Sequence, residues 1–215
     1  MMACGMFITL EGAEGVGKST QLRLLKEKLE AQGQKVLATR EPGGSAGAED
    51  LRQLLLFGKN PLSARAEILT HFAARYDHVD QVILPALKAG QIVLCDRFTD
   101  STLAYQGYGR ANGDPAILSL IAILQKQLGL QPDITFLLQA PRAVSRQRLA
   151  ARGAPTDRYE QADEAFHARL ADGFAHIAQA EPQRVVVVDT SVYSAEQVNA
   201  QILKDIQTRL AHAEG

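Results

Sequence analysis

The stretch Gly12-Ala13-Glu14-Gly15-Val16-Gly17-Lys18-Ser19-Thr20 decides the fold of this 215-residue chain. It matches the pattern G-x-x-x-x-G-K-[ST] in full, directly after a short apolar run. Glycines in such a loop let backbone N–H groups turn inward around phosphate oxygens, and the helix that follows presents its positive end to them. We therefore expect these residues to bind a nucleotide triphosphate, with the Lys18 amine at the β and γ phosphates and the Ser19 hydroxyl on Mg²⁺.

The phosphate-binding motif does not by itself distinguish a kinase from a GTPase or another ATPase. The Asn-Lys-x-Asp pattern expected of a GTP-specific protein is absent from the sequence. A glycine-rich turn that binds nothing is the remaining alternative, and the strand before the motif and the helix after it both disfavour that interpretation.

Short apolar runs along the chain predict the strands of a buried parallel sheet. Segments with helical period lie between these runs, which indicates right-handed β–α–β units and an α/β fold of the P-loop type. In such folds ligands bind at the carboxyl ends of the strands. The expected strands are Met6–Leu10, Ile92–Cys95, Ile134–Leu138, Val185–Val188 and, more weakly, Val36–Thr39.

Helix signals occur at three places between the strands. Leucines every three or four residues predict a helix after the motif that stops at Gly33. Asp114-Pro115 is a helix start, and Ser194 with Gln197 predicts a capping box. The helix from Asp114 to Leu128 is apolar around most of its circumference, so either the core surrounds it or a second subunit covers part of it.

Composition places limits on the class of protein. The length suits a single domain over residues 1–215, and a net charge of -1 argues against a general nucleic-acid-binding protein. Cys4 and Cys95 have no metal-type or redox-type spacing, which favours a reducing cytoplasm over a disulfide framework. No basic residue precedes Lys18 and no apolar run reaches membrane length, so we expect neither a signal peptide nor a membrane partner.

Asp96-Arg97 ends one of the apolar runs. An aspartate at this position in a P-loop protein is placed to help hold Mg²⁺, directly or through water. The neighbouring Arg97 offers a bidentate fork for a phosphate. A surface Asp-Arg pair without function is the less favoured alternative.

Three blocks of sequence together resemble the bacterial thymidylate kinase family. They are the phosphate-binding motif, Thr39-Arg40-Glu41-Pro42-Gly43-Gly44, and Asp96-Arg97-Phe98-Thr99-Asp100-Ser101-Thr102-Leu103-Ala104-Tyr105-Gln106. The blocks and their spacing span nearly the whole chain. The resemblance implies transfer of the γ-phosphoryl group of ATP to dTMP for dTTP synthesis, a five-stranded parallel sheet, a mobile arginine-rich lid at about residues 142–160, and a homodimer.

The resemblance also implies roles for individual residues on the acceptor side. These are Glu14 near the sugar 3′-hydroxyl, Arg97 and Arg40 near the phosphate, Glu41 assisting Ser19 and Asp96 at the metal, Arg75 at a thymine carbonyl with Arg52 close by, Thr102 and Gln106 near the thymine N3 edge with Ser101 beside them, and Tyr105 against the sugar 2′ position.

One position departs from the pattern of the family, which commonly has a phenylalanine four residues before the base-reading arginine. His71 occupies that place here, and Phe72 lies three residues before Arg75. Spacings of three and four both put a side chain on the helical face of the arginine. We expect Phe72 to stack on the base after a small rotation, with His71 as the alternative and ordinary core packing of Phe72 as a third possibility.

Five arginines cluster in the expected lid: Arg142, Arg146, Arg148, Arg152 and Arg158. Arginines facing one way suit the charge that develops on a transferring phosphoryl group. A solvated helix face is the alternative, and a nucleic-acid patch is disfavoured by the lack of interleaved aromatics. Some family members carry an arginine inside the phosphate-binding loop, where this chain has Gly15, so we expect Arg148, Arg152 and Arg158 to supply that charge, alongside the catalytic Lys18, Asp96 and Arg97.

Two rival functions remain open at this point. One is a kinase for a different nucleoside monophosphate or for a deoxynucleoside. The other is a P-loop switch that binds a nucleotide and changes protein partners, which the acceptor-side matches disfavour.

Overall fold

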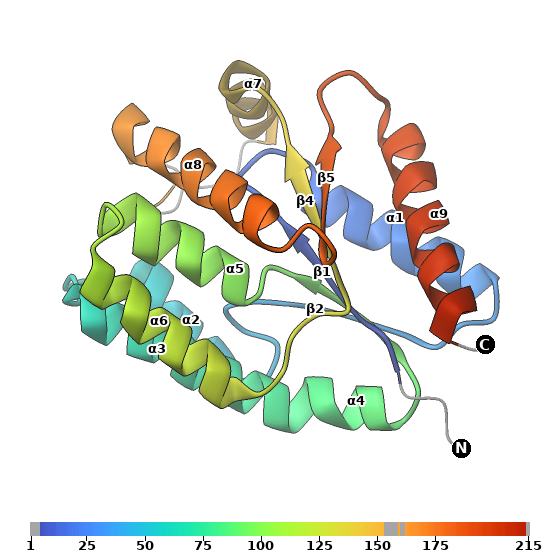
Figure 1. Ribbon diagram of the computed structural model, residues 1–215, viewed down its shortest axis with the longest axis horizontal. Coiled ribbons are helices and arrows are strands. Elements are labelled where there is room, and N and C mark those ends of the chain that lie inside the picture. The colour runs from blue at the N-terminus through green and yellow to red at the C-terminus, as the bar shows by residue number, and fades with distance from the viewer. Residues whose placement is uncertain (1–4, 153–158, 160–161, 214–215) are drawn as a thin grey trace.

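A five-stranded parallel sheet forms the centre of the molecule, with the strand order β2-β3-β1-β4-β5 (Figure 1). The computed structural model describes residues 5–152, 159 and 162–213. Within that part of the chain no helix combines the length and the apolar character needed to cross a membrane. The strands are β1 (Phe7–Glu11), β2 (Val36–Arg40), β3 (Ile92–Asp96), β4 (Ile134–Gln139) and β5 (Val185–Asp189).

The five strands predicted from the apolar runs are confirmed, and each ends one residue later than expected. The added residue is polar in every strand, yet its backbone is still paired in the sheet, as in the registers Leu10 with Asp96 and Glu11 with Leu137. Apolar patterning misses such residues because it reads the side chain and not the backbone ladder. The extension places carboxylates at the ligand-binding edge of the sheet.

Helices cover both faces of the sheet (Figure 1). Ile8 and Leu10 of β1 point to the face covered by α1 and α9, whereas Phe7 points to the opposite face, against η1 and α4. This alternation follows from the two-residue period of a strand. The helices are α1 (Lys18–Ala31), α2 (Ala46–Phe57), α3 (Ala64–His78), α4 (Leu84–Lys88), α5 (Thr99–Thr102), α6 (Pro115–Leu128), α7 (Arg142–Arg152), α8 (Glu164–Ala180) and α9 (Ala195–Ala213), with π-helical segments η1 (Val79–Ile83) and η2 (Leu103–Arg110).

The helix signals read from the sequence are confirmed at three termini: the end of α1, the start of α6 and the start of α9. Gly33 follows the end of α1 in the left-handed conformation, with a φ of 82°. The backbone N–H of Ser194 donates to the Gln197 side chain at 2.9 Å, and the N–H of Gln197 donates to the Ser194 hydroxyl at 3.3 Å, which is a complete capping box.

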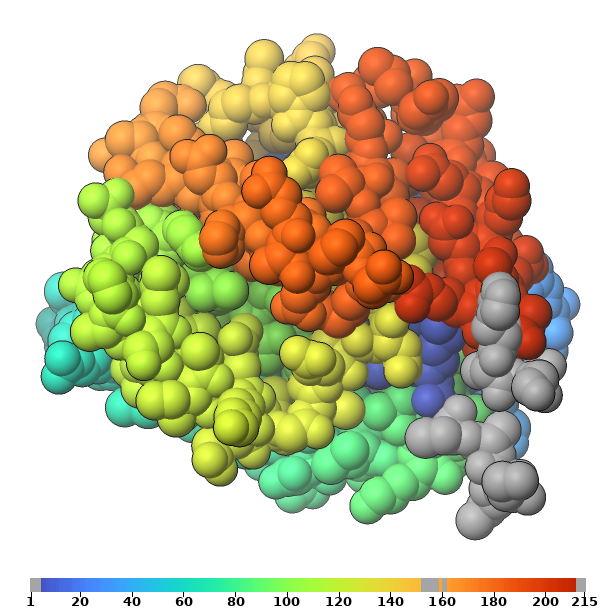
Figure 2. Space-filling view, in the orientation of Figure 1, coloured from blue at the N-terminus to red at the C-terminus, as the bar shows by residue number. Residues whose placement is uncertain are grey.

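The apolar helix α6 is only partly covered by the rest of the chain. Ile117 and Ile121 are buried against Ile68 and Phe72, but Ile123 is 56% exposed. Leu69 of the neighbouring helix α3 is also 50% exposed. Side chains of α6 form part of the surface in the space-filling view (Figure 2). The core therefore covers one side of this helix and leaves Ile123 exposed on the other, and both alternatives for the rest of its surface stay open.

Replacing Asp114 with alanine should lower the free energy of unfolding by about 1 kcal/mol, because α6 loses its N-cap. The Asp114 carboxylate accepts the backbone N–H of Ala116 at 2.8 Å and that of Ile117 at 3.1 Å. Urea denaturation measures the change. Asp114→Asn is the matched control, because asparagine caps helices about as well as aspartate; equal losses in the two variants would contradict the capping role.

Candidate active site

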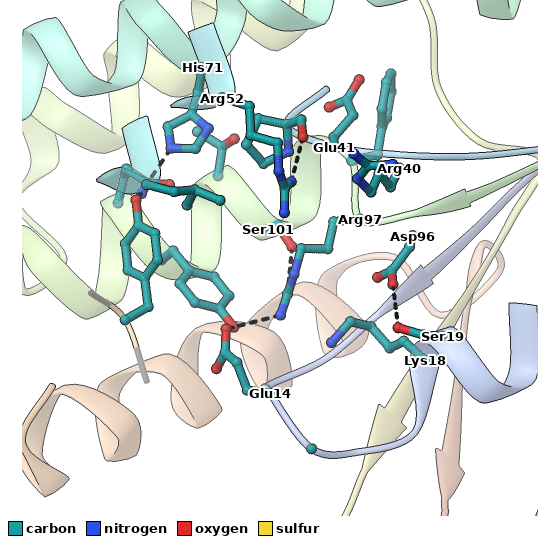
Figure 3. A pocket seen from close by; sticks show the side chains of 18 of the residues that line it. Glu14, Lys18, Ser19, Arg40, Glu41, Arg52, His71, Asp96, Arg97 and Ser101 are labelled. Carbon is teal, nitrogen blue, oxygen red and sulfur yellow. Dashed lines mark hydrogen bonds and ion pairs between the residues drawn. The ribbon is translucent and has the colours of Figure 1, made fainter. Parts of the chain in front are cut away.

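A cavity of about 600 Å³ opens at the carboxyl ends of the central strands (Figure 3). The cavity brings together segments that are far apart in the sequence: the loop after β1, the ends of β2 and β3, the helix α3 and the middle of α7. Its walls include most of the residues predicted for the site, namely Glu14, Gly15, Gly17, Lys18, Ser19, Thr20, Arg40, Glu41, Arg52, His71, Arg75, Asp96, Arg97, Ser101, Thr102, Tyr105, Gln106 and Arg148.

The phosphate-binding loop joins β1 to α1. Three of its residues do not line this cavity and instead pack against the rest of the chain on the other side of the loop. Gly12 has a φ of 127°, and a Cβ atom there would lie 2.2 Å from the carbonyl oxygen of Leu138. Val16 is buried, and its carbonyl oxygen accepts the Thr190 hydroxyl at 2.9 Å. Ala13 packs against the same core. Gly12, Ala13 and Val16 therefore set the course of the loop, as its motif requires.

The Lys18 side chain is buried and folds back over its own loop. Its Nζ donates to the carbonyl oxygens of Gly12 at 3.0 Å and Ala13 at 2.8 Å. Burial, together with the nearby charge of Arg97, lowers the pKa of the amine to about 8. The amine therefore stays largely protonated at neutral pH and can face phosphate oxygens.

Ser19 and Asp96 meet at the mouth of the loop, as expected for a pair of metal ligands. The Ser19 hydroxyl donates to Asp96 Oδ2 at 3.2 Å, and the buried Asp96 Oδ1 has no hydrogen-bond partner among the described residues. Hydroxyl and carboxylate oxygens are the donors that Mg²⁺ prefers, so this pair fits the ion. The described part of the chain contains no group of three or more His, Cys, Asp and Glu side chains able to hold a metal.

Arg97 connects the phosphate-binding loop to the far wall of the cavity. Its Nη1 donates to the Gly12 carbonyl at 2.8 Å and the Ser101 hydroxyl at 3.1 Å, and its Nη2 donates to Glu14 at 3.0 Å. The guanidinium also lies over the ring of Tyr105, 4.9 Å from its centroid. The backbone of Arg97 is left-handed, with a φ of 72°, which is strained for a residue other than glycine.

The loop carboxylate of Glu14 is ionised despite its surroundings. Burial would raise its pKa, but the charges of Arg97 and Lys18 and a hydrogen bond from Tyr105 hold the pKa below its ordinary value. Its Oε2 is buried without a partner among the described residues. A charged acceptor is therefore available at the cavity wall for a donor such as a sugar hydroxyl.

Arg75 extends from α3 into the acceptor end of the cavity. Its Nε donates to Glu41 at 2.6 Å, and its Nη2 donates to the carbonyl of Phe98 at 3.1 Å and the hydroxyl of Thr102 at 3.0 Å. Its Nη1 is buried with no partner among the described residues. One donor of a fixed guanidinium is thus left for a ligand in the cavity.

Glu41 makes contacts that differ from those expected of a metal ligand. Its carboxylate is buried, and its two oxygens accept hydrogen bonds from Arg75 Nε at 2.6 Å and His78 Nδ1 at 3.0 Å. Both oxygens are therefore engaged by side chains of α3, and Glu41 holds Arg75 Nε; its expected role at the metal stays a prediction. Sequence spacing did not reveal His78 as the second partner.

Two further arginines follow the second strand. Arg40 pairs with Glu49 at 2.9 Å at the exposed rim of the cavity. Arg52 donates from Nη1 to the carbonyl oxygen of Pro42 at 2.6 Å, which ties α2 to the loop after β2. Both side chains line the cavity as predicted.

The expectation that Phe72 stacks on the base is not supported by its position. Phe72 is 1% exposed and packs in the core with Ile68, Ile117 and Ile121. His71 lines the cavity instead, with its Nε2 3.4 Å from the hydroxyl oxygen of Tyr159. Adjacent residues on a helix differ by about 100° in direction, so only one of the two faces the cavity. The alternative, His71, is the one that does.

The remaining cavity residues predicted from the sequence lie on α5 and η2, and their side chains hydrogen-bond to residues of other segments. The Gln106 amide donates to Glu67 and to the Tyr159 hydroxyl, each at 3.0 Å. The Tyr159 hydroxyl also donates to Glu67 at 3.0 Å. Tyr159 was missed in the sequence because no motif or periodicity surrounds it, and Glu67 was missed because a lone acidic residue in a helix usually faces solvent.

The predicted lid arginines separate into two groups. Arg142 and Arg146 both pair with Glu164, at 3.6 and 3.2 Å, and Arg146 lies on the solvated helix face that was the alternative interpretation. Arg148 lines the cavity and donates to the carbonyl and hydroxyl oxygens of Thr190, at 2.7 and 3.2 Å. The side chain of Arg152, and all of Arg158, lie outside the described residues.

Comparisons with known proteins agree with one another. The family model described as thymidylate kinase matches residues 10–202. A thymidylate kinase of Gluconobacter oxydans is 56% identical over 210 residues, covering 98% of each chain. One from Synechococcus sp. is 50% identical over 205 residues, covering 95% of this chain and 96% of the other. The crystal structure of thymidylate kinase from Ehrlichia chaffeensis superposes with a TM-score of 0.75 at 36% identity, covering 95% of this chain and 99% of that one.

Glu11 should make the protein less stable as the pH rises from about 4.5 to about 7. The side chain is fully buried, and burial, followed by the charge of Asp100, raises its pKa from 4.5 to about 7. Across that window the folded protein holds a proton that the unfolded chain releases, so its free energy of unfolding falls, by about 1 kcal/mol per pH unit. Below about pH 4.5 the contribution of Glu11 to the free energy of unfolding no longer changes with pH.

Urea denaturation of the wild type and Glu11→Gln between pH 4.5 and 7.5 isolates this contribution, because other titrating groups are common to both proteins. The stability of the wild type relative to the variant should decline over the window. A difference that does not vary with pH would contradict a raised pKa at Glu11.

Proposed function

The chain belongs to the thymidylate kinase family, and we propose that it phosphorylates dTMP to dTDP with ATP and Mg²⁺ as donor and metal. The single observation that carries this proposal is that one cavity contains both a triphosphate-binding loop and a second set of buried donors and acceptors. A P-loop hydrolase or switch needs the first set alone. A kinase must hold two nucleotides with their phosphates facing each other, so that the acceptor oxygen attacks in line.

On the donor side, the loop Gly12–Thr20 wraps the ATP phosphates, and Lys18 leaves its loop carbonyls for the β and γ phosphates. The pair formed by Ser19 and Asp96 holds Mg²⁺. When bound, the ion neutralises charge on the phosphate oxygens. The protein supplies positioning and positive charge rather than a covalent intermediate.

On the acceptor side, Arg97 binds the monophosphate of dTMP, with Arg40 at the rim of the cavity. Glu14 accepts the 3′-hydroxyl, and the ring of Tyr105 crowds the 2′ position, which disfavours ribonucleotides. The 3.0 Å distance between Arg97 Nη2 and Glu14 Oε1 supports adjacent recognition of the phosphate and the sugar.

The base occupies the end of the cavity near α3. The free Nη1 of Arg75 donates to a thymine carbonyl, and Thr102 and Gln106 lie near the N3 edge, with Ser101 and Arg52 completing the wall. His71 replaces a phenyl ring as the stacking partner, since Phe72 is buried in the core.

Arg148 is the lid residue best placed to act on the transferring phosphoryl group, and we include Arg152 and Arg158 with it. Closure of the lid over bound substrates would exclude water and so limit wasteful hydrolysis of ATP. The helix positions of Arg142 and Arg146, paired with Glu164, keep these two arginines out of that role.

We further propose a cytoplasmic homodimer without nucleic-acid or membrane partners. The exposed side chains of Ile123 on α6 and Leu69 on α3 support the homodimer, because a second subunit could cover both.

Initial rates with MgATP and a panel of acceptors should show a clear preference for dTMP over dUMP, dCMP, AMP and thymidine. Lys18→Ala is the inactive control. Transfer should be abolished while circular dichroism remains that of a folded protein, because among the described residues Lys18 Nζ donates only to the carbonyls of its own loop. Preference for another acceptor would overturn the substrate, and turnover without any acceptor would favour a nucleotide switch.

Arg75→Ala should mainly weaken dTMP binding, by roughly 10- to 100-fold, because a buried charged donor to the base is lost. The Michaelis constants for dTMP and ATP, measured separately, give the result. ATP affinity should stay nearly unchanged, since the contacts of Arg75 lie at the acceptor end. An equal loss of both affinities would contradict the assigned role.

A further inference from the structure

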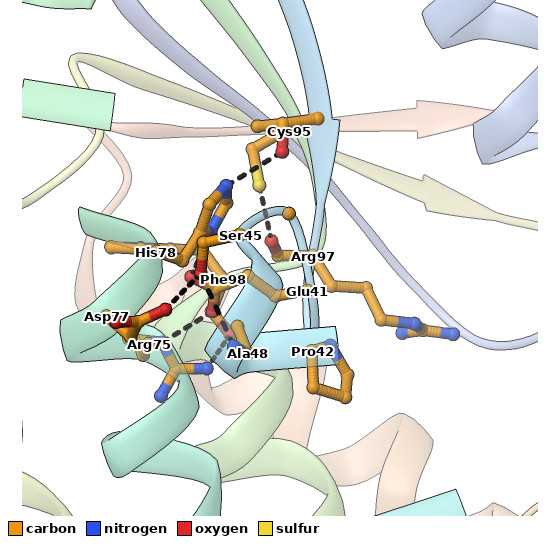
Figure 4. A network of polar contacts seen from close by, with 12 residues as sticks. Glu41, Pro42, Ser45, Ala48, Arg75, Asp77, His78, Cys95, Arg97 and Phe98 are labelled. Carbon is orange, nitrogen blue, oxygen red and sulfur yellow. Dashed lines mark hydrogen bonds and ion pairs between the residues drawn. The ribbon is translucent and has the colours of Figure 1, made fainter. Parts of the chain in front are cut away.

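A chain of buried polar contacts links the end of β2 to the last turn of α3 (Figure 4). Thr39 Oγ1 lies 2.7 Å from His78 Nε2, and His78 Nδ1 lies 3.0 Å from Glu41 Oε1. The other oxygen of Glu41 accepts Arg75 Nε at 2.6 Å. None of these contacts involves the phosphate-binding loop, so the chain belongs to the acceptor end of the cavity.

The contacts of His78 determine which of its ring nitrogens carries a proton. A carboxylate only accepts hydrogen bonds, so Nδ1 must donate to Glu41. The Thr39 hydroxyl can then donate to Nε2 of a neutral ring, which holds both the tautomer and the ring plane. The ring is fully buried, and a Cβ atom at Gly44 would lie 2.3 Å from its Nε2, so the space around it is closed.

Glu41 in turn limits the directions open to the Arg75 guanidinium. With Nε bound to Glu41 and Nη2 bound to Phe98 and Thr102, the planar group cannot rotate without breaking a hydrogen bond. The direction of the remaining donor, Nη1, is thus set by the position of the Glu41 carboxylate. His78 is the second donor to that carboxylate.

We propose that His78 is a positioning residue for the acceptor nucleotide, acting through Glu41 on Arg75. This inference rests on the proposed function, in which Arg75 Nη1 binds the pyrimidine base of dTMP. His78 does not line the cavity, so it acts through its neighbours. Its contribution is to keep the Glu41 carboxylate in the one orientation that aims Nη1 into the site.

The loop after β2 has other anchors, which separates this role from simple loop stabilisation. Ser45 Oγ contacts Asp77 at 2.5 Å, one residue before His78, and Arg52 donates to Pro42 at 2.6 Å. Loss of the His78 ring should therefore release the Glu41 carboxylate while the loop keeps its place.

Steady-state kinetics of His78→Ala and His78→Asn test the proposal. His78→Ala should raise KM for dTMP about tenfold, change kcat less than about twofold and leave KM for ATP unchanged. The asparagine amide can occupy the place of Nδ1–H and donate to Glu41, so His78→Asn should return KM for dTMP to within about threefold of the wild type. An unchanged KM for dTMP in His78→Ala overturns the proposal.

A double-mutant cycle shows whether His78 acts through Arg75. In an Arg75→Ala background, His78→Ala should have no further effect on kcat/KM for dTMP, because the group it positions is gone. A further tenfold loss in that background would mean that His78 acts independently, and would overturn the proposal.

Asn199→Ala is the control for general destabilisation. Asn199 is fully buried and donates to Gln21 at 3.0 Å, between α1 and α9 and away from α3. The Asn199→Ala substitution should lower the thermal midpoint without raising KM for dTMP. A tenfold rise of KM for dTMP in Asn199→Ala would show that the effect of His78→Ala is merely structural, and would overturn the proposal.

If His78→Ala does not fold, Thr39→Val tests the proposal in its place. Thr39→Val should raise KM for dTMP about threefold, and an unchanged KM overturns the proposal.

The wild-type assay distinguishes the two levels of inference. A wild type that makes no dTDP from dTMP contradicts the proposed function. An active wild type with a normal KM for dTMP in His78→Ala contradicts only the role of His78.

Discussion

The guanidinium of Arg97 holds the two halves of the active-site cavity together. It bonds the carbonyl of Gly12 and the carboxylate of Glu14 on one side and the hydroxyl of Ser101 on the other. These contacts depend on β1 and β3 being neighbours in the sheet, and on a left-handed backbone at Arg97 that turns the side chain inward. The two walls of the cavity are held at a fixed spacing because one residue bonds to both.

Features encoded by local chemistry were predictable from the sequence. Apolar runs located all five strands, the glycine-rich motif located the turn after β1, and Asp114-Pro115 and Ser194 located two helix starts. Each of these signals reports on a few consecutive residues and on the backbone they favour. The predicted strands ended one residue short because residues such as Glu11 and Asp96 carry polar side chains while their backbones still pair in the sheet.

Features that depend on packing were predicted less well. The direction of His71 as against Phe72 follows from how α3 sits on α6, which the spacing to Arg75 does not report. Glu41 was expected at the metal, but its two buried partners come from α3, more than thirty residues away along the chain. A carboxylate after a strand is compatible with either role until the partners of both of its oxygens are known.

The close packing of Gly15 against α7 limits which substitutions this position can accept in evolution. Its φ is 75°, and a Cβ atom there would lie 2.5 Å from the carbonyl oxygen of Ser145 and 3.0 Å from the Leu149 side chain, both in α7. A descendant that acquired an arginine at this position would need to shift α7 away at the same time. Moving a positive charge from α7 to the phosphate-binding loop therefore requires two changes together, the substitution at position 15 and a shift of α7.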